Sequence, residues 1–313
     1  MKRVLLNLLI CPACLPAEIV LGSRIIKEEG EDILEGSLSC PQCGNVYPVR
    51  EGIAFLDPVS PARAAKHDSK YETAPVLSSY LWSHYGDILK DPEATPAYRE
   101  WADLMAPHAG MAVDAGSAVG RFTFEMSLKS DFAVGVDNSL SFIRSARRLM
   151  MDRSMKIDLK EEGHFTREVV LSLPEAWDSR KVEFIVGDAQ CLPFPSGTFS
   201  SLASLNLVDK VPVPLRHMKE LHRLAAEQDA QLLLSDPFSW SEDAAPQENW
   251  LGGTEKGPFT GRGMENIMAL LANEKNGWSP LWRVERHGHI WWKIRTHANH
   301  FELIRSCFVK AVR

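Results

Sequence analysis

Short apolar runs and amphipathic helical patterns alternate along the chain from residue 111 onward. The apolar runs of strand length, which we expect to form β-strands, lie at residues 112–114, 132–136, 182–186, 201–205 and 231–235. Segments with apolar residues at helical spacing lie at residues 121–128, 140–151 and 215–226. Strands that alternate with helices predict an α/β domain whose mostly parallel sheet is covered by helices on both faces.

An apolar run at residues 4–10 follows two basic residues and leads directly into Cys11. We expect this run to be a first β-strand that enters a metal-binding knuckle, because it is too short for a lipoprotein signal peptide. No stretch of the sequence approaches the roughly 18 apolar residues of a membrane span. The sequence therefore predicts a cytoplasmic protein without a membrane partner.

The pattern divides the chain into three parts. Residues 1–57 hold short β-like runs and predict a small β-rich module. Residues 58–107 predict a linker and a helical cap: a Pro/Ala/Ser segment at 57–65 comes first, and helix formers and aromatic residues follow it. We expect these helices to pack over the mouth of a ligand site. Residues 108–313 then form the larger domain.

The bulk composition is that of an ordinary globular protein. Hydrophobic residues make up 45% of the 313 residues and charged residues 24%, and the formal net charge is −6. A protein that grips nucleic acid through a broad basic face carries the opposite balance. Nucleic acid is therefore the less favoured partner, although a local basic patch within an acidic total is compatible with this sequence.

Four of the six cysteines form two Cys-x-x-Cys pairs, Cys11 with Cys14 and Cys40 with Cys43. Two such pairs are typical of a tetrahedral Zn²⁺ site in a reducing compartment. The alternative is a set of buried cysteines or a redox pair. We expect structural zinc to supply much of the folding energy of so small a module, so that its loss unfolds the module and leaves the larger domain folded.

Residues 40–53 read CPQCGNVYPVREGI. They resemble the small zinc-ribbon family that activates tRNA and protein methyltransferases, over roughly the first 57 residues. The best-known members of that family work as protein partners rather than catalysts. The resemblance therefore implies a candidate protein partner for this ribbon.

The first strand of the larger domain runs into a glycine-containing turn. The turn spans Asp114, Gly116, Ser117 and Gly120, with Ala118 where a further glycine is usual. Glycine is needed where backbone approaches a ligand closely and turns sharply into a helix. Alone this motif is weak, because dinucleotide-binding Rossmann folds use a similar turn.

Two acids further along the chain distinguish these alternatives. Asp137, followed by Asn138, ends the second strand, where a carboxylate accepts hydrogen bonds from both ribose hydroxyls. Asp188 and Ala189 follow the third strand in the string GDAQCLPF. Together the motifs resemble the class I S-adenosylmethionine-dependent methyltransferases, in which the latter acid binds the adenine amino group. The resemblance implies a Rossmann-like fold with a mostly parallel seven-stranded sheet, and S-adenosylmethionine as cofactor.

The fourth strand ends in the string SLNLVDKV, where parallel sheets place their chemistry. Asn206 and Asp209 are the candidate catalytic residues, Asn206 at the edge of the cofactor and Asp209 as a proton acceptor. The alternative is that both only make loop hydrogen bonds ahead of Pro212 and Pro214.

A second resemblance covers about residues 110–313. The strings SDPFSWSE at 235–242 and PQENWLGG at 246–253, with NLVD at 206–209, are similar to the C-terminal methyltransferase domain of the ovothiol biosynthesis enzyme. That domain N-methylates the imidazole of a thiol-histidine. The resemblance implies a substrate pocket formed by Trp240, Asn249 and Trp250. Trp291 and Trp292 are further candidates to wall a pocket for a flat substrate, against the alternative of core packing.

Three functions are compatible with these features. The leading hypothesis is a methyltransferase that acts on a small molecule, an imidazole- or thiol-bearing metabolite. The rival enzyme is an rRNA or tRNA base methyltransferase whose zinc ribbon contacts RNA. A third hypothesis is a non-catalytic scaffold whose ribbon recruits a partner, and the intact cofactor motifs argue against it.

Overall fold

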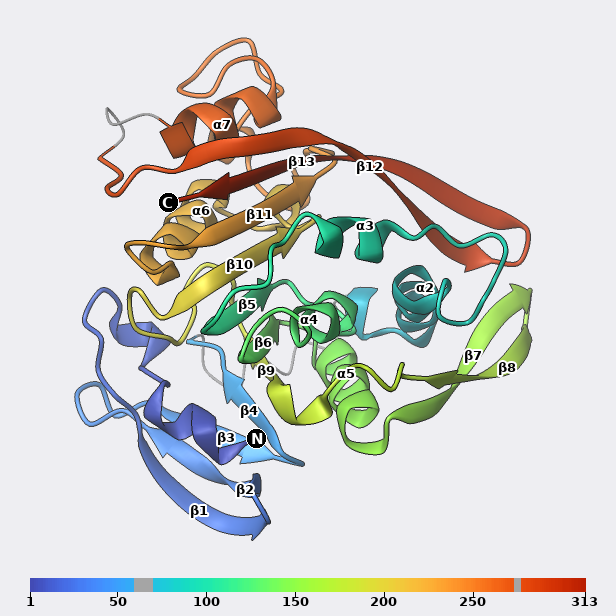
Figure 1. Ribbon diagram of the computed structural model, residues 1–313, viewed down its shortest axis with the longest axis horizontal. Helices are drawn as coiled ribbons and strands as arrows, with labels where there is room; N and C mark the ends of the chain where they lie inside the picture. The colour runs from blue at the N-terminus through green and yellow to red at the C-terminus, as the bar shows by residue number, and fades with distance from the viewer. Residues whose placement is uncertain (59–69, 273–276) are drawn as a thin grey trace.

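The computed structural model describes residues 1–58, 70–272 and 277–313, and an eleven-stranded sheet runs through the molecule (Figure 1). In spatial order its strands are β1 (Gly22–Glu29), β2 (Asp32–Ser39), β3 (Val46–Arg50), β4 (Ile53–Leu56), β9 (Val182–Gly187), β6 (Phe132–Asp137), β5 (Met111–Ala115), β10 (Phe199–Leu205), β11 (Gln231–Asp236), β13 (His300–Val312) and β12 (Arg283–His297). The predicted strands of the larger domain are all present.

The sheet is mixed and larger than the seven strands we predicted. Its middle, from β4 to β11, is parallel, whereas β13 and β12 at one end and β1 to β3 at the other are antiparallel. The seven strands from β9 to β12 belong to the larger domain. The N-terminal module continues them because β4 pairs in parallel with β9, Phe55 opposite Val186 and Leu56 opposite Gly187.

Helices cover both faces of this sheet, as predicted. The helices are α2 (Ala74–Tyr85), α3 (Ala97–Asp103), α4 (Arg121–Met126), α5 (Leu140–Asp152), α6 (Pro214–Leu224) and α7 (Gly263–Ala272). Side chains that alternate along each strand enter opposite cores: Val134 and Val136 pack with the core of α6 and α7, and Ala133 packs with that of α2 to α5. Period-2 alternation thus distributes each central strand between two cores.

The N-terminal module shares the first of these cores. Cys11, Leu38 and Tyr47 belong to the same contiguous apolar cluster as Met218 of α6 and Leu270 of α7. The predicted boundary at residue 57 therefore crosses a common core, and the boundaries stay predictions. The predicted linker lies for the most part outside the described residues, which resume at residue 70.

The predicted strand at residues 4–10 is wrong: residues Arg3–Asn7 form a 3₁₀ helix. Met1, Leu5 and Leu9 are buried, whereas Val4 is half exposed. The buried residues are therefore four positions apart, which is a helical spacing. The segment packs one side of this helix against the ribbon. The segment that follows α5 forms a separate hairpin of β7 (Ser154–Glu162) and β8 (Phe165–Ser172).

A buried ion cluster joins the module to the larger domain. Arg147 of α5 forms ion pairs with Asp32 of β2 and with Glu183 of β9, and the backbone N–H of Lys2 donates to Glu183. Burial opposes ionisation of Glu183, but the positive charges of Arg147, Lys2 and the N-terminal ammonium outweigh it and lower its pKa to about 2. The cluster thus fixes the module against α5 and β9. In the described part of the chain, no helix is long and apolar enough to cross a membrane.

Candidate metal centre and ligand cavity

The four predicted cysteines come together at one end of the N-terminal module. Their sulfur atoms all lie within 4.8 Å of one another. The Sγ atoms of Cys11 and Cys43 are 3.6 Å apart, and those of Cys14 and Cys40 are 3.7 Å apart. Thiolates at about 2.3 Å from a tetrahedral zinc ion lie about 3.8 Å from each other, so the cluster fits Zn²⁺.

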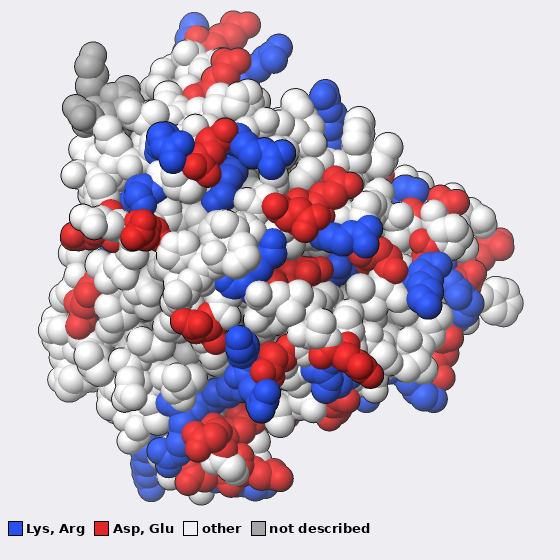
Figure 2. Space-filling model, viewed as in Figure 1, with Lys and Arg blue, Asp and Glu red and all other residues white. Residues whose placement is uncertain are grey.

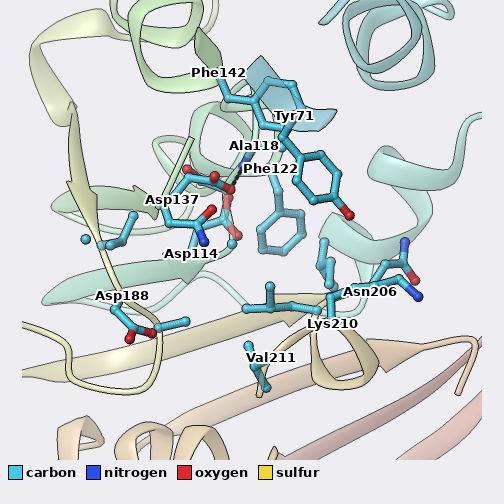
Figure 3. A pocket seen from close by; sticks show the side chains of 18 of the residues that line it. Tyr71, Asp114, Ala118, Phe122, Asp137, Phe142, Asp188, Asn206, Lys210 and Val211 are labelled. Atoms are coloured by element: carbon cyan, nitrogen blue, oxygen red, sulfur yellow. Dashed lines mark hydrogen bonds between the residues drawn. The ribbon is translucent and has the colours of Figure 1, made fainter. Parts of the chain in front are cut away.

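A cavity of about 260 Å³ opens at the carboxyl ends of the parallel strands. Figure 3 shows part of its lining, which we divide into two halves named after the ligands that the sequence predicts. The cofactor half is lined by Asp57, Asp114, Gly116, Ser117, Ala118, Val136, Asp137, Asn138, Gly187, Asp188, Ala189, Gln190, Leu207, Val211 and Pro212. The acceptor half is lined by Tyr71, Tyr80, His84, Tyr98, Phe122, Phe142, Leu205, Asn206, Lys210 and Trp292.

The turn after β5 forms the floor of the cofactor half. Gly116 adopts φ +80°, and a Cβ there would come within 2.8 Å of Leu207. The next residue, Ser117, is buried, and its hydroxyl has no hydrogen-bond partner in the structure, which leaves it open to a ligand. Gly120, with φ +85°, begins α4 and is required by packing, because a Cβ would meet the ring of Phe184 at 2.6 Å. Gly120 is not among the residues that line the cavity.

Asp137 closes this turn from the neighbouring strand. Its carboxylate accepts hydrogen bonds from the N–H groups of Ala118, at 2.8 Å, and Ser139, at 2.9 Å. Burial raises the pKa of Asp137 to about 6 even though both bonds favour the ionised form. Asp114 lies beneath, where burial raises its pKa to about 7 while a hydrogen bond from Thr123 opposes the shift. The two acids therefore ionise near neutral pH.

Asp188 and Ala189 line the same half at the end of β9. The carboxylate of Asp188 accepts a hydrogen bond from the N–H of Gln190 at 2.8 Å. The carbonyl of Ala189 is bonded to Nδ1 of the buried His217, at 2.9 Å, whose Nε2 is bonded to Ser204 at 2.9 Å. His217 thereby ties the loop after β9 to β10, and the predicted cofactor residues all lie within one edge of the sheet.

Asn206 stands where the two halves meet. It adopts φ +57°, a left-handed conformation that asparagine tolerates better than most residues. The hydroxyl of Ser306 donates to its Oδ1 at 2.6 Å, and its buried Nδ2 has no partner. Figure 3 shows Asn206 and Lys210 on the side of the cavity opposite Asp188.

Asp209 lies behind the cavity wall. It is 1% exposed, and its Oδ2 accepts hydrogen bonds from the N–H of Ser239, at 2.7 Å, and pairs with Lys210, at 3.1 Å. Burial raises its pKa, and Lys210 opposes that rise. Lys210 lines the cavity and Asp209 does not. The predicted role of Asp209 as a proton acceptor stays a prediction.

Trp240, Asn249 and Trp250 lie outside the cavity wall as well. The rings of Trp240 and Trp250 stack on each other at 6.1 Å, and the indole N–H of Trp250 donates to Ala245. Asn249 supports the rim, because its amide donates to the carbonyl of Pro212 at 3.0 Å. The predicted substrate pocket at these residues therefore stays a prediction, and the structure brings none of the three to the cavity.

Several residues of the cavity escaped the sequence interpretation. His84 of α2 and Lys210 after β10 carried no motif, although aromatic helices over a ligand mouth, with Tyr80 among their residues, were expected in the region of α2. Asp57 directly follows β4 and enters the cofactor half only because β4 joins the parallel strands. Of the two candidate tryptophans on β12, Trp292 lines the acceptor half and Trp291 is half exposed.

Two family models match the chain. Residues 2–52 match the family described as Trm112p-like protein, and residues 113–228 match a methyltransferase domain. A comparison with curated proteins gave no match. The chain therefore contains a Trm112-like zinc-ribbon domain, whose four clustered cysteines are compatible with structural zinc, and a methyltransferase domain. Its larger domain makes the chain a methyltransferase.

Solved structures of distant sequence align with most of the chain. The YcgJ protein from Bacillus subtilis is 12% identical, with a TM-score of 0.44 over 69% of this chain and 96% of its own. Magnesium protoporphyrin IX methyltransferase from Synechocystis PCC 6803, solved with bound S-adenosylmethionine, is 16% identical, with a TM-score of 0.42 over 75% and 82%. A structure that contains the Haloferax volcanii Trm112 methyltransferase activator is 13% identical, with a TM-score of 0.43 over 75% and 96%.

Proposed function

We propose that this enzyme transfers the methyl group of S-adenosylmethionine to a small molecule that binds in the acceptor half of the cavity. The observation that carries the proposal is the burial of that half. Its wall includes His84 of α2, Tyr98 of α3 and Trp292 of β12, which are 3%, 6% and 4% exposed. Helices and a strand from three parts of the chain thus enclose the space beside the cofactor half.

The cofactor half has the groups that S-adenosylmethionine requires. We assign the ribose hydroxyls to the carboxylate of Asp137 and the adenine amino group to Asp188, with Asn138 and Ala189 beside them. Gly116 and Ser117 let the backbone of the turn approach the ligand closely. When bound, the cofactor supplies an electrophilic methyl group, and the protein's part is to align the acceptor atom with it and exclude water.

Asn206 and Lys210 are the residues that orient the acceptor. Both line the cavity, and the buried Nδ2 of Asn206 has no partner within the protein. We assign Asp209 a positioning role, because it holds the ammonium group of Lys210 through an ion pair of 3.1 Å. The resemblance to the ovothiol-forming domain makes an imidazole- or thiol-bearing metabolite the first acceptor to test.

The ribbon, in this proposal, serves the catalytic domain of its own chain. Its last strand pairs with β9, its core merges with that of α6 and α7, and Asp57 reaches the cofactor half directly after β4. Candidate boundaries at residues 57 and 107 therefore mark a ribbon and a helical cap that act as one unit with residues 108–313. A further protein partner would have to bind another part of the ribbon.

The distribution of charge supports a small acceptor over RNA. On the face shown in Figure 2, acidic and basic side chains are interspersed, and no broad basic area covers it. RNA-binding surfaces gather Lys and Arg along the path of the phosphates. The alternative function, an rRNA or tRNA methyltransferase, is tested in the same experiment as the small-molecule proposal.

The test offers S-adenosylmethionine labelled in its methyl group with either total RNA or a panel of imidazole and thiol metabolites. We expect label in a metabolite and none in RNA. Label in RNA alone would refute the small-molecule proposal. The control is Asp137→Ala, which should slow transfer to whichever acceptor is used, at limiting S-adenosylmethionine, because it removes the ribose-binding carboxylate.

A further inference from the structure

We propose that the acceptor half recognises a small, flat molecule through oxygen atoms that accept hydrogen bonds, as carboxylate or carbonyl oxygens do. The proposal rests on the proposed function, since it assigns a substrate class to the same cavity. It is carried by three residues that line the acceptor half, each of which has a buried side-chain nitrogen without a partner within the protein.

Two of these donors are plain from their side-chain chemistry. The indole Nε1 of Trp292 is a donor only, and it is buried without a partner. The amide of Asn206 has its oxygen satisfied by Ser306, which leaves the Nδ2 group as the unsatisfied end. Buried polar groups almost always have partners, so each of these groups indicates a missing acceptor.

The third donor is Nδ1 of His84. Burial, and secondarily the charge of Arg121, hold the pKa of His84 well below its ordinary value, so the ring is neutral and has one N–H. The hydroxyl of Tyr98 lies 2.6 Å from Nε2, and burial raises the pKa of Tyr98 well above 10, so this hydroxyl keeps its proton. We assign the Tyr98 hydroxyl as the donor to Nε2, which places the ring hydrogen of His84 on Nδ1.

The remaining polar lining is consistent with this polarity. Among the described residues, the cavity has one further buried polar side-chain atom without a partner, the Ser117 hydroxyl, and it lies in the cofactor half. Lys210 adds an ammonium group to the acceptor half, and its charge is balanced by Asp209 behind it. The N–H groups of the acceptor half therefore favour a ligand whose oxygen atoms accept hydrogen bonds.

The walls of the acceptor half select a flat shape. Tyr80 and Phe142 lie with ring centres 4.7 Å apart, Tyr71 meets Phe142 edge-on at 5.9 Å, and Trp292 meets Tyr80 at 6.3 Å. Figure 3 shows Tyr71 and Phe142 above the cavity and Phe122 at its centre. Aromatic walls of this kind pack best on the faces and edges of another ring.

The test compares three probes of one shape: benzoate, benzamide and benzamidine. Benzoate offers two acceptor oxygens, benzamide a neutral carbonyl, and benzamidine only N–H donors with a positive charge. Calorimetry would use the full chain saturated with S-adenosylhomocysteine. We expect benzoate or benzamide to bind at least tenfold more tightly than benzamidine, and the ratio of the first two separates an anionic from a neutral acceptor.

Two variants then locate the binding groups. Trp292→Phe removes one N–H and keeps an aromatic ring. It should weaken the binding of the preferred probe about five- to tenfold, which is the effect of one hydrogen bond. The matched control is Trp282→Phe, since Trp282 is equally buried but donates to His222 outside the cavity. Asn206→Asp replaces a donor with an acceptor and should shift the preference toward benzamidine.

The outcomes separate this inference from the proposed function. Equal or tighter binding of benzamidine, no binding of any probe, or an unchanged affinity in Trp292→Phe would overturn the donor assignment while S-adenosylhomocysteine still bound. Failure of the full chain to bind S-adenosylhomocysteine would overturn the proposed function, whatever the probes do.

Discussion

The ion cluster between ribbon and catalytic domain allows a quantitative test of their union. Glu183→Gln keeps the shape of a fully buried side chain and removes its charge. In the folded chain this carboxylate pairs with Arg147 and accepts from the backbone of Lys2. The substitution leaves Arg147 with Asp32 as its remaining ion-pair partner, so the cluster loses one of its two carboxylates.

The size of the effect follows from the ionisation of Glu183. Its pKa falls from an ordinary 4.5 to about 2 on folding. At about 1.4 kcal/mol for each unit, the ionised group contributes roughly 3 kcal/mol to the free energy of unfolding. Breaking a buried pair by removing one partner costs a similar amount, about 3–5 kcal/mol. We therefore expect Glu183→Gln to lower the free energy of unfolding by about 3 kcal/mol at pH 7.

The same shift sets a pH window. Because the folded pKa lies below the unfolded one, the stabilisation is complete above pH 4.5 and is lost as the pH falls toward 2. Wild-type protein should lose this contribution over that interval, and Glu183→Gln should not. Urea unfolding, followed by tryptophan fluorescence at several pH values, measures both curves.

A surface pair provides the control. Glu28 pairs with Arg3 at 2.7 Å, and both side chains are more than 40% exposed, at 42% and 44%. Glu28→Gln should therefore change the free energy of unfolding by no more than about 0.5 kcal/mol. If Glu183→Gln at pH 7 behaved like this control, the reasoning that the cluster joins the two parts would be refuted.

Three further predictions concern the metal and the cofactor. Purified protein should contain about one zinc ion per chain. Removing zinc with a chelator should weaken the binding of S-adenosylhomocysteine, because Asp57, which lines the cavity, is positioned by β4 of the ribbon. Unchanged affinity for S-adenosylhomocysteine in zinc-free protein would contradict this coupling. Asp137→Ala should weaken the binding of S-adenosylhomocysteine at least tenfold, about 1.4 kcal/mol by calorimetry, because it removes a charged acceptor of hydrogen bonds. Asp152→Ala, on the exposed end of α5, is the control and should bind S-adenosylhomocysteine normally. With the pKa of Asp137 raised to about 6, affinity for S-adenosylhomocysteine should be constant above that pH and fall up to tenfold for each pH unit below it; an affinity independent of pH between 5 and 7 would show that the ionised carboxylate is not what binds.

Local pattern was enough to predict the middle of the catalytic domain. Short apolar runs bounded by turns became β5, β6, β9, β10 and β11, because a buried parallel strand needs apolar side chains on both faces. The acids at the strand ends were located for the same reason, since parallel strands present their carboxyl ends at one edge. Cysteine spacing predicted the metal cluster because two short knuckles leave the sulfur atoms few other arrangements.

Local pattern failed where a segment's partner decided its structure. The run at residues 4–10 is apolar enough for a strand, but its contacts with the ribbon made it a 3₁₀ helix. Trp240 and Trp250, one in each of the strings at 235–242 and 246–253, stack on each other and do not line the cavity, and the substrate pocket expected there stays a prediction. Composition cannot distinguish these outcomes, because an aromatic side chain is stabilised by burial in a core as much as in a ligand site.

The sequence by itself determined the strands, the cofactor turn and the four-cysteine cluster, all of which depend on residues close together in the chain. Only the tertiary structure decided that β4 extends the catalytic sheet, that Arg147 meets Asp32 and Glu183, and that Trp292, His84 and Asn206 line one cavity. Most of these contacts join residues far apart in the chain: Arg147 and Asp32 are separated by 115 positions, and Arg147 and Glu183 by 36. They form because strand edges and apolar faces are complementary in three dimensions. The periodicity of the sequence does not specify which strand edges pair with each other.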